Sequence, residues 1–307
     1  MNWNKSGRVF VANKHSNWMV SHAMIPTPIL LNEAVLRIYT TFCDENKVGR
    51  VGYVDVSADN PSYILGWSKE PCLDIGKPGQ FDDNGVVGCS VILLPNGRIR
   101  MYYAGFELCH RVRHRILTGI AESDDGGHFV RLQNMPFLER SEDESFCRGA
   151  PFCYSSGNQH KLWYAASNDW IKVNGVEKLV SVIKMTESLD GLDWSGASKL
   201  CFDIDFDHEF GFSRPYVRKN GVNYEMYYTI RDYKIGYRLG YAVSSDGLKW
   251  QRQDEFVNFP PGVDGEWDSE MLCYPAVITI KNQTYLFYSG NNFGETGFGY
   301  AQLIKNE

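Results

Sequence analysis

The sequence predicts an all-β fold, a five-bladed β-propeller of four-stranded antiparallel blades that spans residues 1–307 as one domain. Three observations predict it. A turn motif recurs along the chain, two strand patterns recur ahead of it, and the composition is rich in aromatic residues (14%) and in glycine (29 residues). Such a composition favours strands and turns over helices. No linker or low-complexity segment divides the chain. The alternative with a similar number of strands is a pair of β-sandwiches.

The turn motif reads Ser-x-Asp-Gly-x-x-aromatic. It occurs at 123–129, 188–194 and 244–250, with a degenerate copy at 57–63. Asp-Gly supplies the positive φ that a tight hairpin turn requires, and the aromatic residue anchors the returning strand. A short strand precedes each turn, at 52–56, 119–122, 183–187 and 240–243, and a fifth copy, 299–303, has no turn after it.

Two further strand patterns precede this one in every unit. The nearer is rich in Tyr and Trp and occurs at 37–41, 100–104, 161–165, 225–229 and 285–289. The farther usually starts with Pro and occurs at 28–31, 90–94, 151–154, 215–217 and 275–278. Five units therefore have three strands each, and four add an outer strand after the turn. We expect the N-terminal strand, residues 7–12, to complete the last blade and close the ring.

Charge and composition exclude several classes of function. Lys and Arg total 31 against 37 Asp and Glu, a net charge of −6, which argues against a nucleic-acid-binding protein. No apolar run is long enough for a membrane span, and the N-terminus lacks the apolar run of a signal peptide. The eight cysteines are scattered without a C-x-x-C pair. We interpret them as reduced, mostly buried thiols of a cytoplasmic protein, and we expect neither a metal nor a cofactor. The sequence indicates no particular oligomeric state.

In a propeller the first strand of each blade lines the axis, so polar residues ahead of these strands converge on one funnel. Four units place a carboxylate there, and these are the predicted catalytic residues: Asp83, Glu144, Glu209 and Glu270. Crowded carboxylates raise one another's pKa and neighbouring Arg lowers it, which separates an acid from a base as glycoside cleavage requires. The alternative for each is a turn cap or an ion pair at a blade junction.

Other polar residues at the funnel are predicted to bind substrate. Arg148 and Arg214 are expected to hold a carboxylate or phosphate group, or else to neutralise the acids. The remaining candidates are His22 and His208, expected as hydrogen-bonding walls, together with Asp232 and Asn291. The basic segment 109–115 is interpreted as a solvated loop or an anion-binding lid. Trp18, Trp170 and Phe293 are candidates for stacking on sugar faces.

The closing segment carries a family resemblance. Residues 273–277 read Cys-Tyr-Pro-Ala-Val, 285–291 read Tyr-Leu-Phe-Tyr-Ser-Gly-Asn and 297–301 read Gly-Phe-Gly-Tyr-Ala. With the Pro-led inner strands and Ser-x-Asp-Gly turns, the chain resembles the five-bladed β-propeller glycosidase superfamily, which includes glycoside hydrolase families 43, 32, 62, 68 and 130. The resemblance covers nearly the whole chain.

The resemblance implies a carboxylate on each of three inner strands. These are a base or nucleophile on the first blade, a tuning Asp on the second, which Asp83 fits, and a later general acid, which Glu209 or Glu144 fits. The first blade departs from this pattern, because 24–28 read Met-Ile-Pro-Thr-Pro, and the family's Arg-Asp-Pro motif is missing. Either the chemistry is redistributed, with Glu270 as the candidate, or simple hydrolysis is lost. Family 130 phosphorylases bind phosphate with basic residues, which would give Arg148 and Arg214 a role.

The sequence therefore predicts a carbohydrate-active enzyme acting at a glycosidic bond, a hydrolase or phosphorylase-like enzyme, with an anionic or phosphorylated sugar as substrate. Two alternatives stay open. One is a non-hydrolytic sugar-modifying enzyme of polysaccharide or nucleotide-sugar biosynthesis. The other is a non-catalytic carbohydrate-binding propeller.

Overall fold

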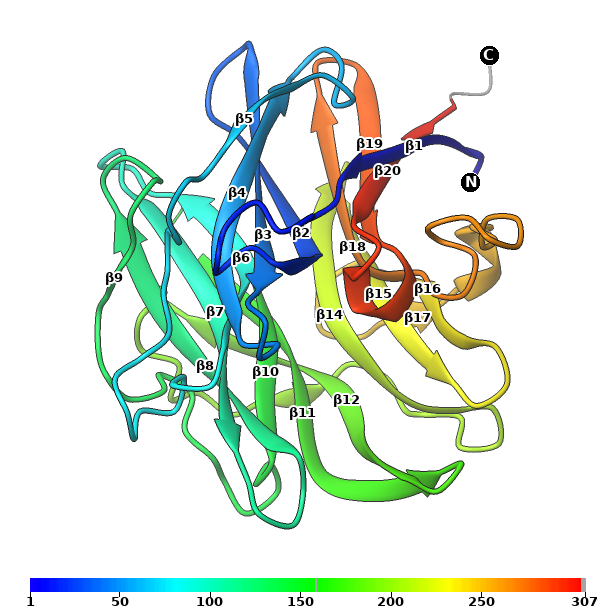
Figure 1. Cartoon of the computed structure of the whole chain (residues 1–307). Helices are drawn as coiled ribbons and strands as arrows, with labels where there is room; N and C mark the ends of the chain where they lie inside the picture. The colour runs from blue at the N-terminus through cyan, green and yellow to red at the C-terminus, as the bar shows by residue number, and fades with distance from the viewer. Residues whose placement is uncertain (158, 305–307) are drawn as a thin grey trace.

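The computed structural model describes residues 1–157 and 159–304, and within them the fold is all-β (Figure 1). A short 3₁₀ helix, η1 (Asp254–Phe256), and one helical turn, α1 (Asn291–Gly294), interrupt the strands. Residues 158 and 305–307, which belong to the predicted domain, lie outside the described part.

The strands pair in sequential antiparallel groups of four. The first group contains β2 (Ser21–Leu30), β3 (Val35–Cys43), β4 (Gly49–Ser57) and β5 (Ile64–Trp67). The second contains β6 (Val86–Leu93), β7 (Ile99–Leu108), β8 (His114–Ser123) and β9 (Val130–Arg131). The third contains β10 (Cys147–Ser156), β11 (Gln159–Val173), β12 (Val176–Ser188) and β13 (Lys199–Leu200).

The fourth group contains β14 (Glu209–Asn220), β15 (Asn223–Asp232), β16 (Gly236–Ser244) and β17 (Gln251–Arg252). The fifth contains β18 (Cys273–Ile280), β19 (Gln283–Ser289), β20 (Phe298–Leu303) and, as its outer strand, β1 (Trp3–Phe10). The N-terminal strand thus adds to the last group as predicted, although it covers Trp3–Phe10 rather than 7–12.

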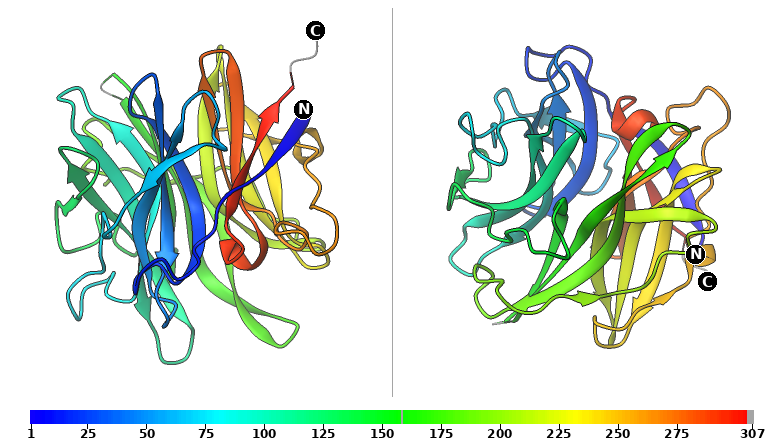
Figure 2. Two further views of the ribbon diagram at one scale, coloured as in Figure 1. Left: turned by 45° about the horizontal axis from the view of Figure 1, so that its top comes forward. Right: turned by 90° about the horizontal axis from the view of Figure 1, so that it is seen from below.

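The groups fan out around a common centre (Figure 2). Each inner strand contacts the next, β2 with β6, β6 with β10, β10 with β14, β14 with β18, and β18 with β2. Isolated parallel pairs, Cys147 with Ile116 and Ser181 with Gly211, join the second, third and fourth groups at their edges. This arrangement brings the starts of the inner strands together, as a propeller does.

A bulge before proline shapes four of the inner strands. The residue before each Pro has a positive φ, 56° at Ile25, 49° at Ala150, 47° at Arg214 and 58° at Tyr274. The strand registers shift at the same places. Because Pro has no N–H to give to the ladder, pairing breaks there and the bulge redirects the preceding side chain. Three of these side chains, Ile25, Ala150 and Tyr274, meet in one cluster on the axis.

The Ser-x-Asp-Gly turns join neighbouring groups. In the turn of the second group, the Ser123 Oγ accepts the Gly126 N–H at 2.8 Å, and Gly126 has a φ of 73°. The buried carbonyl oxygen of Gly126 accepts the Tyr39 hydroxyl of the first group at 2.8 Å. Gly191 in the third group accepts Tyr102 of the second group in the same way, at 2.8 Å. The recurrent motif therefore fixes each of these groups to the one before it.

All eight cysteines are free thiols, seven of them buried, with Cys109 half-buried in the β7–β8 loop. Among the residues described, no helix is both long and apolar enough to cross a membrane.

Candidate functional site

The four predicted acids lie in separate networks, and the described hydrogen bonds and ion pairs join no two of them. Glu209 is 1% exposed, and its two oxygens accept from the Arg252 guanidinium at 2.5 and 2.9 Å. The Asp205 N–H also donates to it, at 3.2 Å. With both oxygens occupied by protein donors and an exposure of 1%, Glu209 is better suited to a structural role than to the expected role of proton donor.

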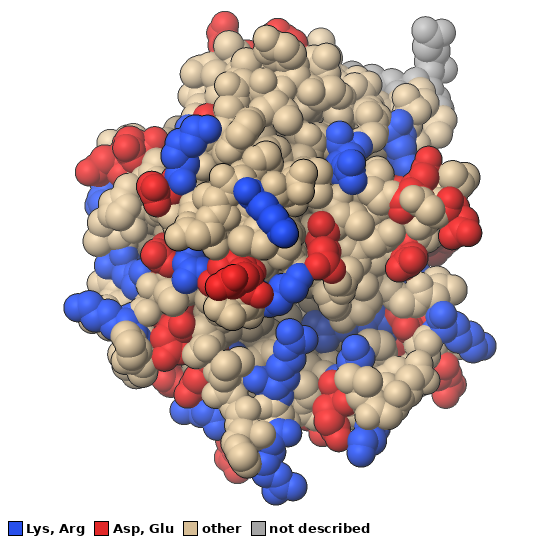
Figure 3. All heavy atoms as spheres, viewed as in Figure 1, with Lys and Arg blue, Asp and Glu red and all other residues tan. Residues whose placement is uncertain are grey.

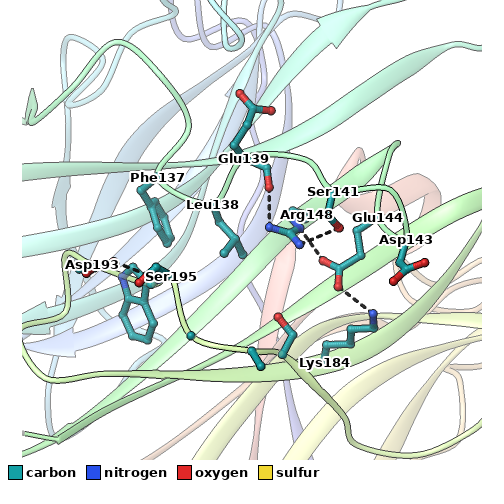
Figure 4. Close-up of a pocket in the computed structure, with 14 residues that line it drawn as sticks. Phe137, Leu138, Glu139, Ser141, Asp143, Glu144, Arg148, Lys184, Asp193 and Ser195 are labelled. Carbon is teal, nitrogen blue, oxygen red and sulfur yellow. Dashed lines mark hydrogen bonds and ion pairs between the residues drawn. The ribbon is translucent and has the colours of Figure 1, made fainter.

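Glu144 is also buried, at 3% exposure, but it lies next to an open cavity. Its carboxylate accepts the Tyr164 hydroxyl at 3.0 Å and pairs with Arg148 Nε at 2.5 Å and Lys184 Nζ at 2.7 Å (Figure 4). The Arg148 guanidinium continues to the Glu139 carbonyl oxygen and to Ser141 Oγ, the latter at 2.9 Å. Arg148 therefore forms an ion pair with the acid in this structure.

Asp83 and Glu270 are the more accessible pair. Asp83 is half-buried, and its oxygens accept from the Gly79 N–H at 2.8 Å and from Asn84 Nδ2 at 2.6 Å. Glu270 is exposed, and its side chain has no hydrogen-bond or ionic partner among the described residues. Its backbone N–H donates to Asn291 Oδ1 at 2.8 Å.

Arg214 is placed where no ligand reaches it. It is 0% exposed, and its guanidinium donates to the carbonyl oxygen of Pro275, to that of Pro26 at 3.1 Å and to that of Cys89 at 3.3 Å. It therefore ties β14 to β18, β2 and β6 across the axis. The expected substrate-binding role is corrected accordingly, because the pre-proline bulge turns this side chain into the packed centre.

The other predicted binding residues mostly organise loops. Asn291 donates to the Glu266 carbonyl oxygen at 3.0 Å, and Asp232 Oδ1 accepts the N–H groups of the two residues that begin its turn, 234 and 235. His208 is largely exposed and bonds Asp205 Oδ2 at 2.8 Å. His22 is buried beside Ser21 Oγ at 3.0 Å, and burial, with Lys47 nearby, lowers its pKa.

The carboxylates that are truly equivalent between groups are Asp82, Glu144, Glu209 and Asp268, all 3% exposed or less. Asp82 accepts the Tyr103 hydroxyl at 2.9 Å and pairs with Arg131 at 2.8 Å. Asp268 accepts the Tyr288 hydroxyl at 2.8 Å and pairs with Lys5 at 2.6 Å. We call this arrangement the carboxylate lock. Sequence reasoning chose Asp83 and Glu270 instead, although in the second, third and fifth groups the second residue of the Tyr-Tyr, Trp-Tyr or Phe-Tyr pair is a tyrosine that donates to the buried acid. In the fourth group the Tyr228 hydroxyl donates to Asp254 instead, and the lock there consists of Glu209 and its cation, Arg252.

The cavity beside Glu144 has a volume of about 410 Å³. It lies between the segment 137–148 and the loop 193–198, with Lys184 of β12 at its floor (Figure 4). A smaller hollow of about 90 Å³ adjoins it and shares Asp143 and Lys184 with it. We call the larger one the third-group cavity.

Aromatic and basic side chains gather where the inner strands begin, and we call them the axial cluster. Ring centroids lie 5.3 Å apart for Phe106 and His114, 6.1 Å for His114 and Trp170, and 6.3 Å for Phe146 and Trp170. The cluster also contains Arg231, Tyr237, Tyr274 and Phe293.

The axial cluster contains a histidine that is neutral at pH 7 and an arginine. Burial, with Arg113 and Arg231 nearby, lowers the pKa of His114 to about 4, so this imidazole is neutral at pH 7. Arg231 donates to the Leu179 carbonyl oxygen at 2.8 Å, and its Nε has no partner in the described part of the chain. The Trp170 indole N–H likewise has no partner there. Of the three aromatic residues predicted to stack on sugars, Trp170 and Phe293 lie here, whereas Trp18 is buried and donates to the Lys69 carbonyl oxygen.

Charges on the face seen in Figure 3 are mixed, with Lys and Arg side chains interspersed among Asp and Glu and no extended area of one sign. Among the described residues, no group of three or more His, Cys, Asp or Glu side chains is arranged to hold a metal ion.

Comparisons with known proteins place the chain in a family and identify its fold. No family model matches. The uncharacterized protein Rv1502 of Mycobacterium tuberculosis (strain H37Rv) is 32% identical over 305 residues, which is 99% of either chain, and the uncharacterized protein MT1551 of strain CDC 1551 matches to the same extent.

Solved structures share the fold at low identity. A glycosyl hydrolase from Bacteroides ovatus has a TM-score of 0.72 at 14% identity and covers 100% of this chain and 95% of its own. A thermostable family-43 glycoside hydrolase has 0.68 at 15% (95% and 93%), and an α-L-arabinofuranosidase from Lactobacillus brevis has 0.69 at 9% (97% and 95%). The chain therefore belongs to the family of Rv1502, and it has the β-propeller fold of the family-43 type glycoside hydrolases.

Proposed function

We propose that this chain is a carbohydrate-active enzyme that acts at a glycosidic bond and binds its saccharide at the axial cluster. We further propose that the five strand groups are the blades of one closed ring and that residues 1–307 form a single domain. The free, buried cysteines are typical of a reducing compartment, which supports a cytoplasmic location.

The observation that carries the proposal is the composition of the axial cluster. Aromatic faces such as Trp170 and Phe293 offer the flat apolar surfaces on which sugar rings stack, and a few polar groups among them fix orientation. Trp170 and Arg231 each keep an unpaired N–H for a ligand. Arg231 is charged beside a neutral His114, so a sugar with a carboxylate or phosphate group fits this cluster better than an uncharged one.

Proton transfer is assigned to Glu270 and Asp83, because Glu144 and Glu209 are engaged in ion pairs. For each of the two, the next residue in the chain contacts the axial cluster. Glu270 precedes Met271, whose sulfur accepts the Phe293 N–H at 3.2 Å, and Asn84, beside Asp83, donates its N–H to the Phe106 carbonyl oxygen at 3.1 Å. Cleavage needs one carboxylic acid to protonate the leaving oxygen and one carboxylate as base or nucleophile. We assign the first role to Glu270 and the second to Asp83.

The test uses aryl glycosides of neutral sugars and of uronic acids as substrates. Glu270→Gln and Asp83→Asn should each lower turnover by about 100-fold or more, with the melting temperature nearly unchanged. Glu255→Gln, at an exposed carboxylate in η1, is the matched control and should keep full activity. Full activity in both variants would end the assignment.

A non-catalytic carbohydrate-binding propeller is the second candidate. It is favoured by the engagement of Glu144 and Glu209 in ion pairs and by the lack of a carboxylate in residues 24–28. It predicts that the protein binds saccharides, that Trp170→Ala abolishes this binding, and that no glycoside is turned over at any pH. Turnover with a bell-shaped pH profile would exclude it.

A further inference from the structure

The third group departs from the repeat at two equivalent positions. On the third strand of the other lock-bearing groups, a glycine stands opposite the second-strand tyrosine: Gly119 faces Tyr103, Gly240 faces Tyr228, and Gly299 faces Tyr288. In the third group this glycine is replaced by Lys184, which faces Tyr164.

The second departure is on the outer strand. It concerns the outer-strand residue that pairs with the third-strand position two residues after the glycine. Arg131 pairs with Ala121, Arg252 with Ala242, and Lys5 with Ala301. In the third group Lys184 pairs with Leu200, and Met185 pairs with Lys199. Continuing this register by one residue places Ser198 at the position where the outer strands of the other three groups have a cation. In the third group the cation therefore comes from the third strand, whereas in the other three groups it comes from the outer strand.

This exchange leaves space beside the acid. In the second group the long Arg131 side chain crosses to Asp82 and covers it. In the third group Lys184 reaches Glu144 from β12, and the short Ser198 only bonds the Tyr164 hydroxyl, at 2.6 Å. Ser198, Lys184 and Glu144 all line the third-group cavity, which occupies the place of the missing side chain (Figure 4).

The residues that line the cavity disfavour a negatively charged ligand. The two cations of the lining, Arg148 and Lys184, are both paired with Glu144. Asp143 and Asp193 add two further acidic residues to the lining, whereas the Glu139 carboxylate points away from the cavity (Figure 4). An anionic ligand would therefore be repelled. Ser141, Ser195 and Ser198 add hydroxyl groups, and Phe137, Leu138 and Trp194 add an apolar wall. Alternating donors and acceptors beside aromatic carbon suit the hydroxyl groups and apolar face of an uncharged sugar ring.

Trp194 supplies a donor without a partner. It is 3% exposed, and its indole N–H makes no hydrogen bond in the described part of the chain. Trp250, at the same place in the next Ser-x-Asp-Gly turn, donates to the Gly247 carbonyl oxygen at 3.1 Å. In the third group the corresponding carbonyl, that of Gly191, accepts Tyr102 instead. A buried donor left open in a polar cavity indicates a ligand acceptor.

We propose that the third-group cavity is a second carbohydrate site, which binds one uncharged sugar ring away from the axial cluster. It shares with the proposed function only the class of ligand. Its residues differ from those of the axial cluster, so each site can fail on its own.

The test follows indole N–H resonances of the ¹⁵N-labelled full chain during titration with the methyl glycosides of glucose, galactose, mannose and xylose. Trp194 reports the cavity, Trp170 reports the axial cluster, and Trp250, whose N–H is already paired, is the control. We expect at least one uncharged glycoside to shift the Trp194 resonance saturably without moving that of Trp250. The methyl glycoside of glucuronic acid should bind at least 10-fold more weakly there.

The double variant Lys184→Gly with Ser198→Arg builds the lock of the second and fourth groups into the third. It should abolish the Trp194 response and leave that of Trp170 intact. Ala197→Trp, on the exposed loop, fills the cavity without moving a buried charge and should do the same. A Trp194 resonance that moves with none of the four glycosides, or that still moves in Ala197→Trp, overturns the inference. A Trp170 resonance that ignores every glycoside counts against the proposed function instead.

Discussion

Arg214 is a charged side chain whose position on the axis follows from local backbone chemistry. It precedes Pro215, and the bulge at that proline gives it a φ of 47° and turns its side chain inward. Burial lowers the pKa of Arg214 to about 10, and carbonyl oxygens of three other inner strands, rather than a carboxylate, receive its N–H groups. The sequence showed an Arg near the axis but not that the packed centre encloses it.

Replacing this guanidinium tests its structural role. Arg214→Met should lower the free energy of unfolding by about 3 kcal/mol or more, because carbonyl oxygens of Pro26, Cys89 and Pro275 are then buried without a donor. Urea unfolding followed by tryptophan fluorescence measures this, with Arg140→Met, at an exposed Arg, as the control. An unchanged unfolding midpoint combined with lost saccharide binding would return Arg214 to the role of ligand contact.

At the scale of elements, the carboxylate lock of the second, fourth and fifth groups connects the approach to an inner strand with the outer strand of the same group, and that of the third group connects it with the third strand. The sequence predicted the units that carry an acid, but in the second and fifth groups it chose a neighbour of the buried one. The reason is that Asp82 and Asp268 lie in turns, where the two-residue alternation of a strand does not decide which of several polar residues faces inward. In the third and fourth groups a single acid stood nearest to the strand, and the prediction named it.

The lock makes Glu209 a stability residue. Glu209→Gln should lower the free energy of unfolding by about 1–3 kcal/mol, because it removes one of the two carboxylates that hold Arg252, which keeps its ion pair with Asp254. Asp207→Asn, two residues away and exposed, should change it by about 0.5 kcal/mol at most. Differential scanning fluorimetry and urea titration provide the comparison. A Glu209→Gln protein of native stability without turnover would show instead that Glu209 takes part in catalysis.

At the scale of the whole molecule, the repeats predicted what all groups share and not where they differ. Strand order and the addition of the N-terminal strand to the last group follow from the tandem pattern, because equivalent strands must pair alike. The axial cluster and the third-group cavity arise from exceptions. β11 (Gln159–Val173) extends beyond its counterparts at the lower edge of Figure 1 and carries Trp170, and Lys184 replaces a glycine. Such differences acquire a meaning only when the groups are superimposed in space.

The many buried hydroxyl and thiol groups predict loss of stability in alkali. Burial raises the pKa of Cys72, Cys89 and Cys147 to about 12 and that of Cys153 to about 11. It also raises the pKa of the buried tyrosines Tyr39, Tyr102, Tyr103, Tyr164, Tyr227, Tyr228 and Tyr288 above the ordinary value of 10.0. All of these groups keep their protons in the folded chain at a pH where the unfolded chain loses them.

The sign follows from proton counts. Above about pH 9 for cysteine and pH 10 for tyrosine, the unfolded chain binds fewer protons than the folded one, so stability falls as pH rises. Each group ionised only in the unfolded chain removes about 1.4 kcal/mol per pH unit. Arg214, whose pKa is lowered, acts in the opposite direction, but it is one group against many. The urea midpoint should therefore be constant from pH 7 to 8 and fall steeply by pH 10.5. A midpoint that stays flat to pH 10.5 would mean that these side chains are already open to solvent in the native protein.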